Sequence, residues 1–306
     1  IPGKFKCPIS VSIEPETLIN APVFCGRLIR GVKNGPSPQW LQNKLRAIGL
    51  RPISTLVDIT NFFTYDNNRP LHVFDADKLN GNSIRVHASQ GGEKFNALDD
   101  KEYVLSEGMT VISDNVGVES LAGIMGGIGS GCTDNTENVF IEAAYFNPIT
   151  TAYTGRELKI NSDARYRFER GIDPEWTAFG IEAATKMIIE LCGGEPSEVV
   201  QAGEIPKHSR AYKVDTARIE SLVGMAIPAD DQLKILENLG FVINEDNAKV
   251  PSWRPDVQGE ADLVEEVARV VSLTKLQGKP LPRVSNSVPK PVLSATQLRE
   301  QSSRRA

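Results

Sequence analysis

The sequence predicts an α+β protein: a mixed α/β domain followed by a small winged-helix-like α+β domain. The 306 residues are enough for about two ordinary domains. Amphipathic helical patterns alternate with short β-rich runs, and the order of these elements changes near Lys207. We expect residues 1–21 to end a preceding domain, residues 22–205 and 207–276 to form the two domains, and residues 277–306 to be a linker.

The composition excludes several classes of protein. With 40% hydrophobic and 24% charged residues, the chain suits a soluble globular protein, and it has no apolar run of about eighteen residues for a membrane span. A formal net charge of -5 provides no global basic field for nucleic acid. The four cysteines lack paired zinc or redox spacing, which favours reduced thiols and a cytoplasmic location. Because the chain lacks an initial Met and ends in a helix-like segment, we expect a fragment.

Helix-capping and helix-breaking residues predict the elements of the first domain. Ser37 as N-cap, Pro38 in the first turn and Gly49 as the stop predict one helix. A second begins at Asp173-Pro174 and ends before Gly193-Gly194. Residues 57–65 fit either a helix or a strand. Strands are expected, with a turn at residues 99–100, over residues 84–86, 103–105, 110–113 and 139–143.

The second domain is expected to combine three strands and three helices. The predicted strands cover residues 212–214, 241–243 and 249–250, and the predicted helices cover residues 215–223, 229–239 and 260–273. Between Lys207 and Gln277 there are nine basic and twelve acidic residues, the opposite of the balance typical of DNA-binding domains. We therefore expect a scaffold or subunit contact and no DNA. The Pro-rich segment 279–291 is typical of a linker.

Seven strings stand out, in order: VDITN (57–61), RPLHVFD (69–75), LAGIMGG (121–127), IEAAYF (141–146), SDARYRFERG (162–171), PSWRPD (251–256) and DLVEEVAR (262–269). Their order and spacing resemble the beta subunit of bacterial phenylalanyl-tRNA synthetase over nearly the whole chain. The resemblance implies a domain that removes tyrosine from tRNA(Phe), followed by a small domain. It also implies an alpha subunit in an alpha2beta2 heterotetramer, and ATP used by the intact enzyme but not bound by this fragment. The alternative is a tRNA-binding or assembly module with a vestigial pocket.

Four residues are expected to carry the hydrolysis. A hydrophobic pocket rejects an added hydroxyl poorly, so a second site is needed to remove tyrosine. The polar groups of that site should bind the tyrosine hydroxyl and should be left unpaired when phenylalanine is present. Glu142 interrupts an apolar run and could accept that bond; otherwise it is a rim or solvent-facing residue. His72 is implied beside the scissile ester, or else packs against Phe74. The resemblance adds Thr60 and Asn61, which alternatively cap a helix or turn.

The substrate-binding positions implied by the resemblance are small residues. Ala122 and Gly123 would let the backbone approach an aromatic ring, or simply form a tight turn. Ser162 and Ala164 also match pocket positions, although some relatives carry threonine where Ser162 stands. Nearby, a basic patch could meet phosphate or form internal ion pairs; it comprises Lys159, Arg165, Arg167 and Arg170.

Carboxylates gather on one face of the last predicted helix of the second domain. Asp262, Glu265 and Glu266 follow i, i+3 and i+4 spacing, and Asp256 lies just upstream. Such carboxylates repel unless a cation or arginines neutralise them. The resemblance implies a Mg²⁺ site, possibly shared with the alpha subunit. The alternative is a solvated face paired with Arg254 and Arg269.

Overall fold

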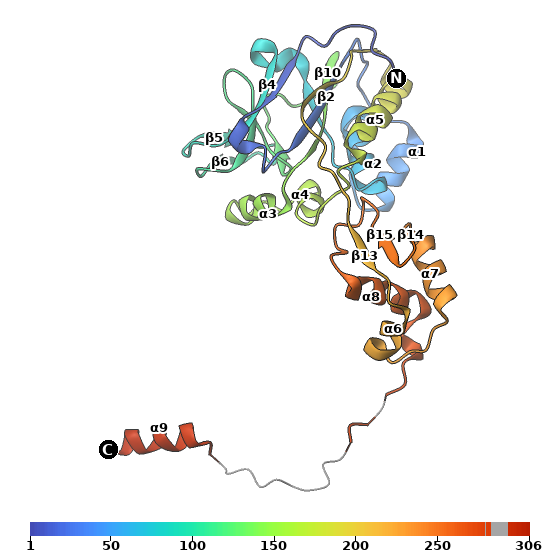
Figure 1. Cartoon of the computed structure of the whole chain (residues 1–306). Coiled ribbons are helices and arrows are strands. Elements are labelled where there is room, and N and C mark those ends of the chain that lie inside the picture. The colour runs from blue at the N-terminus through green and yellow to red at the C-terminus, as the bar shows by residue number, and fades with distance from the viewer. Residues whose placement is uncertain (279, 283–292) are drawn as a thin grey trace.

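The structure is a computed structural model that describes residues 1–278, 280–282 and 293–306. Figure 1 shows two units in chain order, the first holding most of the strands. Part of the predicted linker, residues 279 and 283–292, lies outside the described residues. Beyond it, α9 (Ala295–Arg305) is a helix capped by Ser294. Within the described part of the chain, no helix is both long and apolar enough to cross a bilayer.

The first unit is built on a central sheet in the order β11-β2-β10-β3, with β12 also paired to β2. Its strands are β2 (Val23–Arg30), β3 (His72–Asp75), β10 (Asn138–Tyr145), β11 (Glu195–Pro196) and β12 (Val200–Gly203). One face packs against three helices, which are α1 (Gln39–Ala47), α2 (Thr55–Asp66) and α5 (Trp176–Cys192).

A second sheet lies in the same unit, in the order β1-β4-β7-β8-β9. Its strands are β1 (Ser10–Ile13), β4 (Ser83–Ala88), β7 (Thr110–Ser113), β8 (Val118–Leu121) and β9 (Met125–Gly126), and a separate hairpin pairs β5 (Lys94–Asn96) with β6 (Glu102–Val104). Two short helices follow β10, namely α3 (Pro148–Glu157) and α4 (Asp163–Phe168). β1 pairs in parallel with β4, so residues 10–13 add a strand to this sheet.

Strand alternation decides which way the side chains of β10 point. Val139, Ile141 and Ala143 join the apolar cluster beneath the helices. Phe140 and Ala144 belong to the cluster on the opposite face. Since successive side chains of a strand point to opposite faces, Glu142 lies on the second face, away from α2 and α5. This face also carries the cavity described below.

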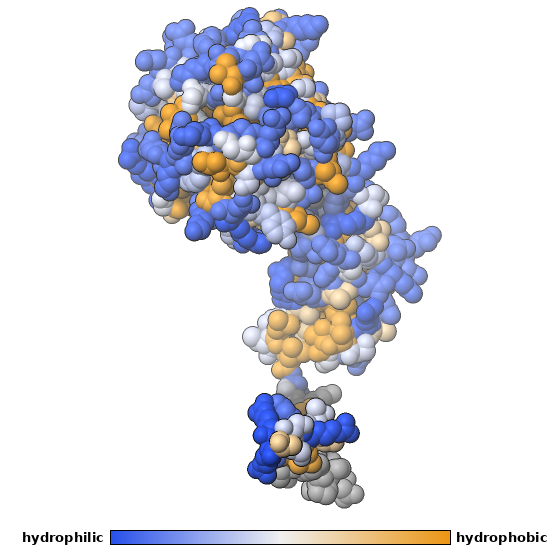
Figure 2. All heavy atoms as spheres, turned by 90° about the vertical axis from the view of Figure 1, so that its left-hand side faces the viewer, coloured by the Kyte–Doolittle hydropathy of each residue, from blue (hydrophilic) through white to orange (hydrophobic). Residues whose placement is uncertain are grey.

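The second unit combines three helices with a three-stranded sheet in the order β13-β15-β14. Its elements are β13 (Ala211–Lys213), α6 (Thr216–Val223), α7 (Ala229–Asn238), β14 (Val242–Asn244), β15 (Asn247–Lys249) and α8 (Glu260–Val271). Figure 2 shows hydrophobic surface on the lower part of this unit. The large hydrophobic residues of the unit that are about half-exposed include Leu222, Val270 and Leu273. The α+β prediction is confirmed for both units.

Two local predictions are settled by side-chain contacts. The helix expected after Ser37 forms, but Pro38 is its N-cap and the Ser37 hydroxyl instead donates to Asp58 Oδ2 at 2.5 Å. The ambiguous segment 57–65 is helical, inside α2. Asp58 in this helix is fully buried and also accepts from the Ile53 backbone N–H. Contacts with residues outside the segment, at Ser37 and Ile53, therefore accompany its helical conformation.

Candidate functional site

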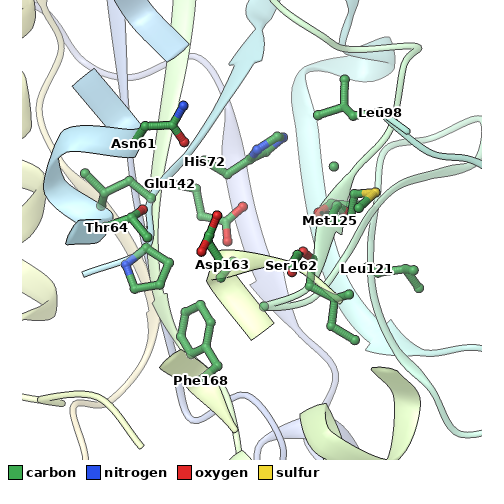
Figure 3. A pocket seen from close by; sticks show the side chains of 17 residues that line it. Asn61, Thr64, His72, Leu98, Leu121, Met125, Glu142, Ser162, Asp163 and Phe168 are labelled. Carbon is green, nitrogen blue, oxygen red and sulfur yellow. Dashed lines mark hydrogen bonds between the residues drawn. The ribbon is translucent and has the colours of Figure 1, made fainter. Parts of the chain in front are cut away.

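A cavity of about 290 Å³ lies between the two sheets and helices α2 and α4 of the first unit. Its size is near the lower end, roughly 300 Å³, of ordinary small-molecule sites. In Figure 3, Asn61 and Thr64 lie on one side of it and Leu98, Leu121 and Met125 on the other. Its wall is mixed: ten of the seventeen lining residues are apolar or glycine, and seven have polar side chains, namely Asn61, Thr64, His72, Ser120, Glu142, Ser162 and Asp163.

Glu142 and His72 are direct cross-strand neighbours at the wall of this cavity. Glu142 on β10 pairs in register with His72 on β3, so both side chains leave the sheet on the same face. Glu142 is 6% exposed. Glu142 Oε2 and His72 Nε2 are both buried, and neither has a hydrogen-bond partner among the described residues. Buried polar atoms without partners are rare in native folds and point to a ligand or an ordered water.

Burial sets the protonation of both groups. It raises the pKa of the Glu142 carboxyl to about 8 and lowers the pKa of the His72 imidazole to about 4. Both shifts disfavour the charged form, as expected for groups removed from water without a charged partner. Near pH 7 the cavity therefore holds a neutral carboxylic acid beside a neutral imidazole. Both groups can donate and accept hydrogen bonds in these forms.

The His72 ring is held by a glycine and an aromatic ring. Its imidazole packs edge-on against Phe74, with ring centroids 4.4 Å apart. On another side lies Gly126, where an added Cβ would fall 2.2 Å from His72 Cε1. The ring therefore packs on Phe74 and also lines the cavity, so packing does not exclude the role beside an ester that the resemblance implies.

Helix α2 brings one of its two expected residues to the cavity. Asn61 lines it, and so does Thr64. Thr60 is absent from the lining, and its hydroxyl donates to the Val57 carbonyl at 2.8 Å within the helix. It lies in the middle of α2 and caps neither end, whereas Thr64, one turn further on, takes the polar position at the wall.

The expected substrate-binding residues divide in the same way. Gly123, Ser162 and Ala164 line the cavity, whereas Ala122 is buried in the core behind it. Gly123 has φ +70°, and a Cβ there would lie 2.9 Å from Phe146, so both its backbone and its packing require glycine. The Ser162 hydroxyl caps α4 and donates to the Ile124 carbonyl at 2.6 Å, which ties this helix to the glycine loop.

The sequence did not identify several residues of the wall. Asp163 lines the cavity and points into it beside Glu142 in Figure 3. Thr64, Leu98, Met125 and Phe168 were not singled out at all. The Gly126-Gly127 pair is the sequence signal that could have pointed to this part of the wall, since close approach of the backbone to a side chain requires glycine.

Two of the four acidic residues singled out in the second unit, Asp256 and Glu266, are paired with arginines. Arg254 donates to Asp256 through Nε and Nη2, and its Nη2 also reaches Glu266 at 2.9 Å. Arg269 also contacts Glu266, while Asp262 accepts from the Gln258 and Gly259 backbone at the start of α8. Burial would raise the pKa of Glu266, but bonds from Arg254 and Arg269 lower it overall.

These contacts do not suit a metal site built from the side chains of this chain alone. No group of three or more ligand-type side chains in the described ranges is arranged to hold an ion. Glu265 is exposed and contributes to none of the contacts above. Mg²⁺ therefore stays a prediction that would require ligands from outside the chain.

The comparisons with known proteins agree with this architecture. A family profile described as the B3/4 domain matches residues 20–193. The chain belongs to the B3/4 domain family. A profile described as the tRNA synthetase B5 domain matches residues 212–272. The B3/4 match contains the whole cavity wall, and the B5 match covers the second unit.

Similar proteins carry the name expected from the motifs. The chain is 63% identical to a phenylalanine–tRNA ligase beta subunit of Ruegeria pomeroyi and 61% identical to that of Cereibacter sphaeroides. Each match covers 100% of this chain and 38% of the relative, so the chain spans about two fifths of those proteins. The resemblance to beta subunits is confirmed. An N-terminal fragment of the phenylalanyl-tRNA synthetase beta-subunit from Pyrococcus horikoshii aligns with TM-score 0.45 at 16% identity, over 87% of this chain and 76% of that one.

Proposed function

We propose that the B3/4 region of this chain hydrolyses tyrosine from mischarged tRNA(Phe). The observation that carries the proposal is the unpartnered Glu142 carboxyl, buried opposite His72 at the wall of the cavity. A tyrosine ring entering this cavity would supply a hydroxyl for that carboxyl. A phenylalanine ring would leave the carboxyl unpaired, which costs about 1–3 kcal/mol.

The reaction needs no cofactor or covalent intermediate from the protein. Water adds to the ester carbonyl carbon, the bond to the ribose oxygen breaks, and that oxygen leaves with a proton to give tyrosine and free tRNA. Neutral His72 can accept a proton from the water or position it, because one ring nitrogen is always a free acceptor. Asn61 and Thr64 have the short polar groups that could hold the amino end of the substrate.

The whole protein would be the beta subunit of phenylalanine–tRNA ligase. Support comes from the names of the relatives. In that setting the chain would assemble with an alpha subunit as an alpha2beta2 heterotetramer, which joins phenylalanine to tRNA(Phe) using ATP. The second unit, acidic overall and matched by the B5 profile, would serve assembly.

A deacylation assay tests the proposal. The chain should release tyrosine from tyrosyl-tRNA(Phe) faster than phenylalanine from phenylalanyl-tRNA(Phe), and His72→Ala should slow the tyrosine reaction at least about tenfold. His87→Ala is the matched control, because His87 lies on β4 outside the cavity wall. Binding of tRNA without any hydrolysis would instead favour an assembly module with a vestigial pocket.

A further inference from the structure

The rim of the cavity carries a stack of alternating aromatic and basic side chains. The Arg167 guanidinium lies 4.2 Å from the centroid of the Tyr65 ring, and that of Arg170 lies 3.7 Å from the Tyr166 centroid. Arg167 is also 6.0 Å from Tyr166, so the four groups form one continuous series. We call it the Tyr–Arg stack; its members are Tyr65, Arg167, Tyr166 and Arg170.

The stack is joined directly to the cavity wall on both of its helices. Tyr65 follows Thr64 on α2, and Arg167 pairs at 3.6 Å with Asp163 on α4. Both Thr64 and Asp163 line the cavity. The stack therefore borders the side of the cavity formed by Thr64 and Asp163.

The two ends of the stack differ in exposure. Tyr166 is 53% exposed and Arg170 is similarly open, whereas Arg167 is largely buried between the helices. The outer pair therefore presents a ring and a planar cation to solvent. The inner pair fixes their position relative to the cavity.

The two arginines of the stack are each paired with a carboxylate, and Arg165 beside them adds a third guanidinium. The internal ion pairs considered from the sequence are present, with Asp163 bound by Arg167 and Glu169 shared by Arg165 and Arg170. Three arginines are thus opposed by two carboxylates. Beyond Tyr65, an apolar groove of about 280 Å³ continues the surface, and Lys44 lies over its Phe62 ring at 5.8 Å.

We propose that the Tyr–Arg stack binds the unpaired 3′ end of the RNA whose terminal ester enters the cavity. Aromatic and guanidinium planes stack on bases, and nearby cations meet phosphates, a combination typical of single-stranded RNA sites. This inference rests on the proposed function for the choice of RNA. It adds a second binding site, outside the cavity, for the nucleotides that precede the terminal one.

Binding of uncharged RNA tests the stack separately from hydrolysis. The probes are a fluorescent RNA hairpin with an unpaired 3′ end and the same hairpin with that end removed. Tyr166→Leu should weaken binding of the first probe about tenfold, as expected for one lost base–aromatic contact, and leave the second unchanged. Tyr166→Phe keeps the ring and should bind within about twofold of wild type, as should Tyr153→Leu, a 65% exposed tyrosine of α3 outside the stack.

Three results would overturn the inference: no effect of Tyr166→Leu, equal weakening for both hairpins, or equal weakening by Tyr153→Leu. Arg170→Gln provides a second variant should Tyr166→Leu alter the thermal melting of the chain. Because neither hairpin carries an amino acid, binding to the unpaired end by a chain that fails to deacylate tyrosyl-tRNA supports the stack and defeats only the proposed hydrolysis.

Discussion

Glu142 on β10 and His72 on β3 are paired in antiparallel register, and each has a buried polar atom without a partner. A fold keeps such atoms at a cost of about 1–3 kcal/mol each. The cost is explained if a ligand provides the missing bonds. The consequences for stability, pH dependence and specificity can each be measured.

Glu142 should make the folded chain less stable as pH rises. Burial raises its pKa to about 8, above the ordinary value of about 4.3 in the unfolded chain. Between these values the folded state retains a proton that the unfolded state releases, so the free energy of unfolding falls by up to about 1.4 kcal/mol per pH unit. Above about pH 8 this contribution levels off. His72 contributes a slope of opposite sign below about pH 6.5 in both wild type and Glu142→Gln, so the difference between their free energies of unfolding isolates Glu142. Urea unfolding should show wild type losing stability relative to Glu142→Gln as pH rises between these values; parallel curves would contradict it.

His72 should not produce an ordinary histidine titration in the rate of hydrolysis. Burial lowers its pKa to about 4, so the free ring is neutral at every pH above about 5. The rate of tyrosyl-tRNA hydrolysis should therefore show no inflection near pH 6.5. A profile measured under single-turnover conditions checks this. Loss of activity with a midpoint near pH 6.5, absent in His72→Gln, would show that the ring titrates normally.

Gly126 should be required for activity because of its contact with His72. A Cβ in Gly126→Ala would lie 2.2 Å from the imidazole and would displace the ring from its place against Phe74. We expect hydrolysis to fall at least about tenfold, since a misplaced catalytic group loses much of its effect. Gly129→Ala is the matched control, because its Cβ meets nothing closer than 3.4 Å. Equal rates of hydrolysis in both variants would show that the contact between Gly126 and the His72 ring is not needed for activity.

The elements with local signals were predictable from sequence. The α5 helix, the Asp99-Asp100 turn and the stop at Gly49 follow from capping residues and glycine, and each is present. The motifs also located six cavity residues correctly. Thr60 and Ala122 were misplaced because a residue's neighbourhood in sequence does not fix which face of a helix or turn it occupies. Asp163 and Phe168 were missed because only the packing of α4 brings them to the wall.

Arginine, and not a metal, should neutralise the acidic face of the isolated chain. Arg254→Gln leaves Glu266, only 7% exposed, with one fewer cation, and should destabilise the second unit by about 1–3 kcal/mol. Urea midpoints of wild type should be the same in Mg²⁺ and in EDTA. Arg218→Gln, an exposed pair with Glu260, is the control and should cost less than about 1 kcal/mol. Stabilisation of wild type by Mg²⁺ that Asp262→Asn abolishes would instead establish a metal site.

If the Glu142 carboxyl recognises a hydroxyl, it sets the ratio of hydrolysis rates on tyrosyl-tRNA(Phe) and phenylalanyl-tRNA(Phe). Glu142→Ala removes the hydrogen bond while leaving the apolar wall in place. We expect Glu142→Ala to lower this ratio roughly tenfold to hundredfold, mainly by slowing the tyrosine reaction. Glu142→Gln should largely retain the wild-type ratio. A ratio unchanged by Glu142→Ala would contradict it.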